Sequence, residues 1–321
     1  MKLSIITPIY NEEETIRPLV EKISDVCERE KYDFEIILVD DGSTDLSAEV
    51  MKEMSEDDPR VKAVHFQRNF GQAAAMSAGF DYATGDLIVT IDADLQNDPK
   101  DIPRLIAKMD EGYDIVSGWR KGRMDNILRI IPSVIANKMI KWTTGVDLHD
   151  IGCTLKVYRK SIVQNIKLYG DLHRFVPILG HRVGAKIAEI EVQHHPRRHG
   201  VSKYGMGRIL RVIFDLFTIK FLLTFSTRPM HFFGYISMVL SIGALLSGGY
   251  AVYMKWFTPR QQDLSDNPLL YLTVLLIIVA VQFLATGLLA EINLRTYHES
   301  EGRVPYIVNC TRNIDEGQKS G

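Results

Sequence analysis

The chain has 321 residues, 46% of them hydrophobic and 24% charged, which allows one large or two ordinary domains and excludes a disordered chain. The net charge of −2 hides an asymmetry, because residues 1–118 carry 26 acidic and 12 basic side chains and the remaining residues carry 14 and 26. This split indicates that the front half holds a group that arrives with cations, and that the back half approaches something anionic. Three distant cysteines, Cys27, Cys153 and Cys310, argue against a disulfide framework or a zinc site and favour a reducing compartment.

The first 120 residues alternate strand-like and helix-like segments. Strands are predicted at Leu3–Ile6, Glu35–Val39, Val61–Phe66, Leu87–Ile91 and Ile115–Ser117, with helices at about 12–29 and 71–83. This alternation predicts an α/β fold with a mostly parallel sheet, covered by helices on both faces, whose ligands gather at the carboxyl ends of the strands. The N-terminus has no apolar run long enough for a signal peptide.

Carboxylates follow two of these strands. Asp40 and Asp41 end the second strand, and Asp92 and Asp94 follow the fourth. The turn after the first strand is acidic and has no glycine, so a diphosphate here needs a metal ion between it and the protein. Two carboxylates one residue apart can place one on a sugar hydroxyl and the other, with Gln96, on Mg²⁺ or Mn²⁺.

Two apolar stretches, residues 229–254 and 268–291, are long enough to cross the roughly 30 Å hydrocarbon core of a membrane. Because both are apolar on every face, membrane helices are favoured over buried helices of a soluble core. The short linker, residues 255–267, predicts a hairpin with both flanks on one side. Basic residues before the hairpin place the large domain in the cytoplasm, at the inner membrane. Residues 205–228 are expected to form an interfacial amphipathic helix, and residues 292–321 a cytoplasmic tail.

Five motifs resemble the signature of inverting family-2 glycosyltransferases. They are Pro8-x-Tyr10-Asn11-Glu12, Val39-Asp40-Asp41-Gly42-Ser43-x-Asp45, Asp92-Ala93-Asp94-Leu95-Gln96, Asp150-Ile151-Gly152-Cys153-x-Leu155-Lys156 and Arg197-Arg198-His199-Gly200-Val201-Ser202-Lys203-Tyr204. The last two are similar to the branch that acts on polyprenyl phosphates, which includes dolichyl-phosphate mannose synthase and the bactoprenyl-phosphate glucosyltransferases. The resemblance covers about residues 1–210 and implies a GT-A-like nucleotide-sugar-binding domain at residues 1–204.

The resemblance also implies a role for each motif position. Its nucleotide-sugar-binding residues are Pro8, Tyr10, Glu12, Asp41, Asp92 and Ala93. Its metal-holding residues are Asp94 and Gln96, and its catalytic residues are Asp94, Arg120 and Asp150. Its acceptor-phosphate residues are Arg129, Arg197, Arg198, Ser202 and Lys203.

The role of Asp150 has two interpretations. In the first, Asp150 is the general base that deprotonates the acceptor. In the second, it positions the acceptor-binding loop or a neighbouring cation such as Arg120. A phosphate monoester is already mostly ionised at pH 7, so a base gains little, and the chemistry favours the positioning role.

The motifs predict transfer of glucose from UDP-glucose to undecaprenyl phosphate, which yields a lipid-linked sugar for the cell envelope. A mannose donor is less favoured, because Asp150-Ile151-Gly152-Cys153 departs from the D-P-x-S-G of many mannose synthases, whereas aminoarabinose stays a competitor. A processive polysaccharide synthase is disfavoured by the absence of a Q-x-x-R-W sequence, and a non-enzymatic scaffold by the intact Asp92 and Asp94. Small residues in the first apolar stretch favour a homo-oligomer, and no nucleic-acid partner is expected.

Overall fold

The computed structural model describes residues 1–121, 146, 148–166, 168, 172–195, 229–257, 267–299 and 305–314. The chain divides into two compact units. The first combines Met1–Leu216 with Val304–Gly321, and the second is Phe217–Arg303. The first unit therefore contains both ends of the chain.

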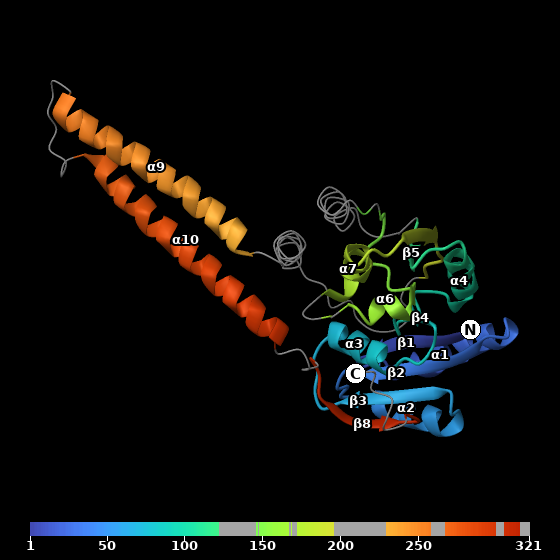
Figure 1. Ribbon diagram of the computed structural model, residues 1–321. Coiled ribbons are helices and arrows are strands. Elements are labelled where there is room, and N and C mark those ends of the chain that lie inside the picture. The colour runs from blue at the N-terminus through green and yellow to red at the C-terminus, as the bar shows by residue number, and fades with distance from the viewer. Residues whose placement is uncertain are drawn as a thin grey trace. The chain divides into compact units, whose positions relative to one another are not determined.

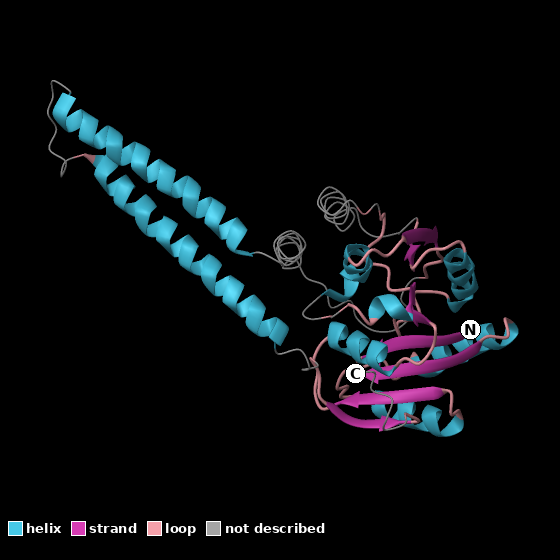
Figure 2. Cartoon of the chain, in the orientation of Figure 1, coloured by secondary structure: helices cyan, strands magenta, loops and turns pink. Residues whose placement is uncertain are grey.

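Eight strands of the described residues form one sheet in the first unit (Figures 1 and 2). They are β1 (Lys2–Ile9), β2 (Asp33–Asp40), β3 (Val61–Phe66), β4 (Leu87–Thr90), β5 (Ile115–Trp119), β6 (Lys156–Arg159), β7 (Ile187–Glu191) and β8 (Val308–Arg312), in the order β7-β5-β6-β4-β1-β2-β3-β8. β1 pairs in parallel with β2 and β4, and β2 with β3, whereas β6 and β8 run antiparallel to their neighbours. The carboxyl ends of β1, β2, β4 and β5 therefore meet at one edge of the sheet.

Helices cover both faces of this sheet. One face packs against α1 (Ile16–Arg29), α2 (Ser47–Asp57) and α4 (Ile102–Asp110), whose buried side chains form one cluster with alternate residues of the strands. The other face packs against α3 (Gln72–Tyr82) and α7 (Val176–Arg182). On that face Gly79 of α3 lies against Ile6, and a Cβ at this position would clash with the Ile6 side chain. α6 (Lys160–Val163) and the short helices η1 (Pro99–Asp101) and η2 (Leu172–Phe175) complete the described elements of this unit.

The edge strand β8 comes from the far end of the sequence. It pairs antiparallel with β3, opposite residues Ala63–Phe66. Just before it, the ring of Tyr306 stacks on Phe66 at 5.0 Å, and its hydroxyl donates a 2.7 Å hydrogen bond to Asp81 of α3. The C-terminal segment is thus fixed to the sheet and to a helix that covers it.

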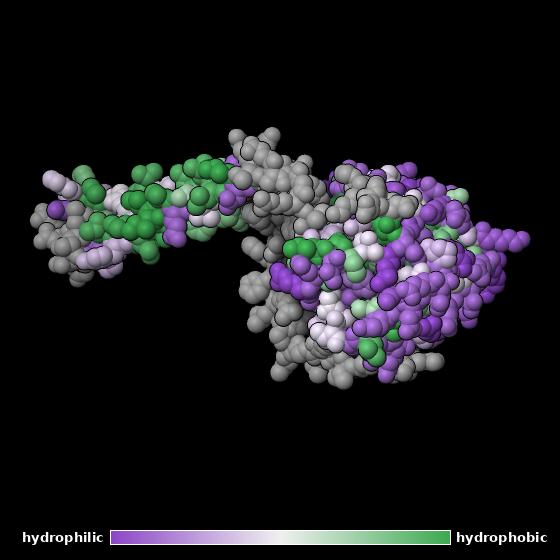
Figure 3. Space-filling model, turned by 90° about the horizontal axis from the view of Figure 1, so that it is seen from below, coloured by the Kyte–Doolittle hydropathy of each residue, from purple (hydrophilic) through white to green (hydrophobic). Residues whose placement is uncertain are grey.

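Two long helices make up the described part of the second unit. α9 (Pro229–Phe257) and α10 (Pro268–Glu299) pack against each other, and both are long and apolar enough to cross a membrane. Ser237 donates to the carbonyl of Ala280 at 2.8 Å, and the Ser247 and Thr273 hydroxyls lie 2.8 Å apart. These bonds satisfy polar groups inside the pair, while most large apolar side chains face outward (Figure 3).

The α/β fold with a mostly parallel sheet and two apolar helices is confirmed. All five predicted strands are present, although β1, β2 and β5 extend beyond the predicted ends. β6, β7 and β8 were not predicted. The expected amphipathic helix, residues 205–228, lies outside the described residues.

The Tyr306 hydroxyl gives a test of how the C-terminal segment is held. We expect Tyr306→Phe to lower the free energy of unfolding by about 1.5–3 kcal/mol, because Asp81 loses a hydrogen bond while the ring stays in place. The measurement is the thermal midpoint of the full-length protein in detergent. Tyr250→Phe, on an exposed tyrosine of α9, is the control and should leave the midpoint unchanged. Equal thermal midpoints for both variants would show that the Tyr306–Asp81 hydrogen bond adds nothing to stability.

Candidate functional site

The loop after β1 is tied to the loop after β2. Asn11 has a left-handed backbone (φ 56°), accepts from the backbone of Thr44 at 2.8 Å, and donates its own amide to Ser43 at 3.0 Å. The amide of Glu12 donates to Ser47 at 2.9 Å. Pro8 and Glu12 are therefore held beside the second loop, and Tyr10 between them is exposed.

The two carboxylates at the end of β2 are buried and fully engaged. Asp40 accepts from the amide of Ser43 at 2.8 Å and lies 3.2 Å from His65. Burial raises the pKa of Asp40, but the bonds from His65 and Ser43 outweigh it and leave the pKa below its usual value. Asp41 accepts from the amides of Phe70 at 2.7 Å and Gly71 at 3.0 Å. Burial is the main reason that the pKa of Asp41 is raised.

Gly42 lets the loop after β2 approach the loop after β3. Its backbone is left-handed (φ 69°), and a Cβ there would clash with the backbone of Arg68. Asp41 consequently reaches the loop after β3 and fixes the start of α3.

The motif after β4 presents two carboxylates at the same edge. Asp92 is half-buried and accepts from Gln72 of α3 at 2.9 Å, and Ala93 is buried. Burial, and then the charge of Asp94, raises the pKa of Asp92 to about 6. The charge of Asp94 thus raises the cost of ionising Asp92, which favours a cation beside the two carboxylates.

Leu95 has a left-handed backbone (φ 57°), which is costly for a branched side chain. The turn lets Asp94 accept from the amide of Gln96 at 3.1 Å, and the carbonyl of Gln96 accepts from His195 at 2.8 Å. The strained residue therefore lies between Asp94 and Gln96, the two positions to which the resemblance assigns a metal ion.

Arg120 and Asp150 form a buried bidentate ion pair. Nε of Arg120 donates to Oδ2 of Asp150 at 2.7 Å, and Nη2 donates to Oδ1 at 3.0 Å. Asp150 is held in turn by Glu189, which accepts from the amides of His149 and Asp150, both at 2.9 Å. Burial lowers the pKa of Arg120, but the neighbouring charge of Asp150 outweighs burial and raises that pKa. Arg120 therefore stays a cation.

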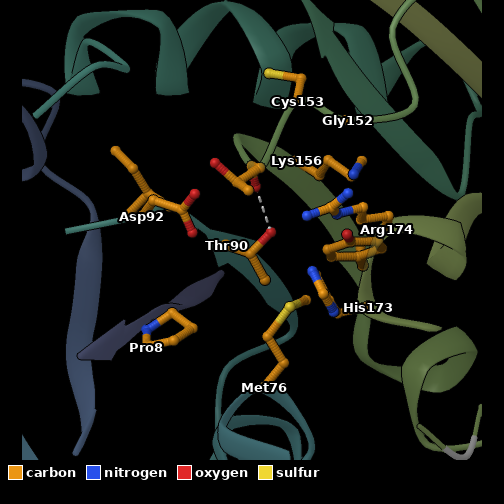
Figure 4. Close-up of a pocket in the computed structure, with 12 residues that line it drawn as sticks. Pro8, Met76, Thr90, Asp92, Gly152, Cys153, Lys156, His173 and Arg174 are labelled. Atoms are coloured by element: carbon orange, nitrogen blue, oxygen red, sulfur yellow. Dashed lines mark hydrogen bonds between the residues drawn. The ribbon is translucent and has the colours of Figure 1, made fainter. Parts of the chain in front are cut away.

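Three basic side chains near Asp92 had no predicted role. Lys156, His173 and Arg174 line a small cavity together with Pro8 and Asp92 (Figure 4). Lys156 lies in β6, between Thr90 of β4 and Ser117 of β5. Its position in a motif was visible in the sequence. That motif is the signal that could have marked it, because β6 begins at Lys156 and contains a second basic residue, Arg159.

The structure thus brings together the predicted residues Pro8, Glu12, Asp41, Asp92, Ala93, Asp94, Gln96, Arg120 and Asp150 on adjoining loops at one edge of the sheet. Five predicted acceptor-phosphate residues, Arg129, Arg197, Arg198, Ser202 and Lys203, lie outside the described residues.

The donor set at this edge fits Mg²⁺ or Mn²⁺ held in part by a substrate. Among the described residues, no group of three or more His, Cys, Asp or Glu side chains is arranged to hold a metal ion. Asp94 and Gln96 offer hard oxygen ligands, and Mg²⁺ commonly completes such a small set with phosphate oxygens and waters. The closeness of Asp92 and Asp94, whose charges oppose each other, is consistent with that arrangement.

Comparison with known proteins shows similarity along almost the whole chain. Residues 4–167 match the family model "Glycosyl transferase family 2". The dodecaprenyl-phosphate galacturonate synthase of Rhizobium johnstonii is 44% identical over 313 residues, which cover 96% of this chain and 92% of that protein. The undecaprenyl-phosphate 4-deoxy-4-formamido-L-arabinose transferase of an Enterobacter species is 40% identical over 308 residues, with the same coverage of both chains.

Solved structures share the fold. Glucosyl-3-phosphoglycerate synthase of Mycobacterium tuberculosis, in complex with Mn²⁺ and UDP-glucose, matches with a TM-score of 0.53 and 17% identity over 68% of this chain and 78% of that one. Mannosyl-3-phosphoglycerate synthase of Rubrobacter xylanophilus matches with a TM-score of 0.53 and 15% identity over 69% and 74%. At these identities the likeness establishes the GT-A fold of the first unit.

The Arg120–Asp150 pair gives a test of stability. We expect Asp150→Ala to lower the free energy of unfolding by about 3–5 kcal/mol, because Arg120 is left as a buried charge without its carboxylate. Glu53→Ala, which breaks the exposed pair with Arg17, should change it by less than about 0.5 kcal/mol. The measurement is the thermal midpoint in detergent. The double variant Arg120→Met with Asp150→Leu should recover part of the loss, and equal midpoints for the two single variants would contradict the expectation.

Proposed function

Because the chain belongs to glycosyl transferase family 2, we propose that it transfers a sugar from a nucleotide diphosphate to a polyprenyl phosphate. The observation that carries the proposal is the similarity over 96% of the chain to two polyprenyl-phosphate transferases. That similarity includes the apolar helices α9 and α10 as well as the site at the sheet edge. An acceptor that is a membrane lipid accounts for both parts.

The donor's nucleotide and sugar would lie over the loops after β1, β2 and β4. Asp94 and Gln96 would hold Mg²⁺ or Mn²⁺ against the diphosphate. The cation supplies charge neutralisation that makes the nucleotide diphosphate a good leaving group. Asp92, fixed by Gln72, is positioned to accept from a hydroxyl of the donor. Tyr10 is exposed next to this pocket and offers an aromatic face to the base.

Arg120 supplies positive charge on the other side of the reacting centre. Its bidentate contact with Asp150 fixes the plane of the guanidinium, so the cation is oriented before a substrate arrives. The acceptor phosphate needs no strong base, since it is mostly ionised at neutral pH. In this arrangement the protein's task is to bring two anions within reach of each other, and attack opposite the leaving diphosphate inverts the anomeric carbon.

The return of the chain to the sheet sets the topology of the hairpin. β8 follows α10 in the sequence and pairs with β3 of the first unit. If α9 and α10 cross a bilayer, both ends of the hairpin must therefore lie on the same side. We assign that side to the cytoplasm of the inner membrane, where nucleotide sugars and the basic flanking residues belong. Gly234 and Gly249 of α9 have open space beside them, which leaves room for a second copy in a homo-oligomer.

The identity of the sugar has three candidates. The motifs favour glucose from UDP-glucose, whereas the names of the two relatives give galacturonate and 4-deoxy-4-formamido-L-arabinose. Membranes that contain the protein should be incubated with each radiolabelled nucleotide sugar, undecaprenyl phosphate and Mg²⁺ or Mn²⁺. We expect label from one of these donors to enter the lipid phase.

The Asp94→Ala variant is the control for that experiment. It should reduce transfer by more than about 100-fold while insertion into the membrane is unchanged, because the cation loses its protein ligand. A scaffold that carries no activity would give no label with either protein. Equal transfer by both proteins would contradict the metal assignment.

The pH dependence of Asp150→Asn separates its two possible roles. We expect the variant to be slower by roughly 100-fold at every pH from 6 to 9, because the misplaced Arg120 is not restored by ionising the acceptor. The measurement is kcat against pH for both proteins with saturating donor. Recovery of the variant to the wild-type rate at high pH would show that Asp150 is a general base.

A further inference from the structure

The cavity beside Asp92 is lined by more positive charge than the described residues neutralise. It is wide enough for about one water molecule. Lys156, His173 and Arg174 occupy one side of it and Asp92 lies across from them (Figure 4). Because Asp92 and Pro8 belong to the donor pocket, the cavity opens from the region where the sugar of a nucleotide sugar would lie.

Lys156 is buried, and its ammonium has more N–H donors than the hydrogen bonds it makes to the described residues. Its ammonium donates to the carbonyl of Ile151 at 3.2 Å, and an ammonium has three N–H donors. Within the described part of the chain, neither nearby carboxylate forms an ion pair with it. Asp150 is bound on both oxygens by Arg120, and Asp92 faces it across the cavity.

His173 and Arg174 add further donors to the same wall. His173 is 6% exposed, and its Nδ1 has no hydrogen-bond partner in the described structure. Burial, and then the charges of Arg174 and Lys156, lowers the pKa of His173 to about 3, so the ring is neutral. A buried nitrogen without a partner is costly, and a ligand that accepts a hydrogen bond would remove that cost.

We propose that Lys156, His173 and Arg174 form a subsite for the carboxylate of a hexuronic acid carried by the nucleotide-sugar donor. This assignment rests on the proposed function and narrows its substrate to an acidic sugar. A carboxylate has two oxygens in one plane, which accept from a guanidinium and an ammonium together. One carboxylate oxygen takes about the room of the single water molecule that the cavity holds, whereas a sugar ring or a phosphate with its lipid chain needs more room.

The test compares donors that differ in one group. UDP-galacturonate and UDP-galactose share every atom except the carboxylate, which is a hydroxymethyl group in galactose. With the full-length protein and undecaprenyl phosphate, we expect kcat/KM to be higher for UDP-galacturonate. Lys156→Met should lower that value by roughly 30- to 300-fold and change the value for UDP-galactose by less than about threefold.

Three further variants keep the test decisive. Lys156→Arg retains the charge and should retain the preference, and Arg174→Gln should weaken it even if Lys156→Met fails to fold. Lys186→Met, on an exposed lysine of the same unit, should change nothing. Binding is read separately, as a larger rise in thermal midpoint with UDP-galacturonate than with UDP-galactose, which is lost in Lys156→Met.

Several outcomes would overturn the subsite. Preferred transfer of galactose, glucose or 4-deoxy-4-formamido-L-arabinose would leave the proposed function standing and contradict the carboxylate assignment. If the Lys156→Met variant instead raised the KM for the lipid phosphate with both donors, Lys156, His173 and Arg174 would belong to the acceptor site. If no sugar is transferred at all, the proposed function fails, and the binding measurement alone decides the subsite.

Discussion

The arrangement of this molecule follows from one electrostatic constraint, the convergence of four carboxylates at a single edge of a parallel sheet. Asp40, Asp41, Asp92 and Asp94 lie at the ends of β2 and β4, which flank β1. Buried carboxylates must find donors or a cation. Asp40 and Asp41 find theirs within the protein, in His65 and in backbone amides. The charge of Asp94 raises the cost of ionising Asp92, and the negative charge of these two neighbours is what a cation-bound diphosphate can use.

The opposite charge is kept on the neighbouring strands. Arg120 after β5 is oriented by Asp150, and Lys156 rises from β6 between two small polar residues, Thr90 and Ser117. The antiparallel strand β6 therefore separates an acidic side of the site from a basic one. The sequence is acidic up to residue 118 and basic after it, and in the fold this difference in charge lies across a few neighbouring strands. Under the proposed function, the donor diphosphate would face the acidic side through its cation, and the acceptor phosphate would face the basic side directly.

The hydrophobic pattern of the sequence predicted those strands that depend mainly on residues close together in the chain. The strands at the start of the sequence are largely apolar runs, two of which lead into carboxylates, and such runs carry their own signal. β8 carries little, because Val308–Arg312 is short, mostly exposed and has few strongly apolar residues, and it forms its strand by pairing with β3, more than 240 residues earlier. The motifs identified Arg120 and Asp150, with pairing offered as one possibility. The cavity at Lys156, His173 and Arg174 depends on packing between β6 and η2, which no spacing in the sequence reports.

The return of the chain to β3 has a consequence for biosynthesis. The ribosome releases β8 only after both α9 and α10 have been made. Until then β3 is an open edge, whose unpaired N–H and C=O groups can bind the wrong strand. The catalytic sheet is therefore completed last, after the apolar hairpin has left the ribosome. A chain that stops before the hairpin would lack its edge strand as well as its helices. The order of translation therefore couples completion of the sheet to the presence of the apolar hairpin.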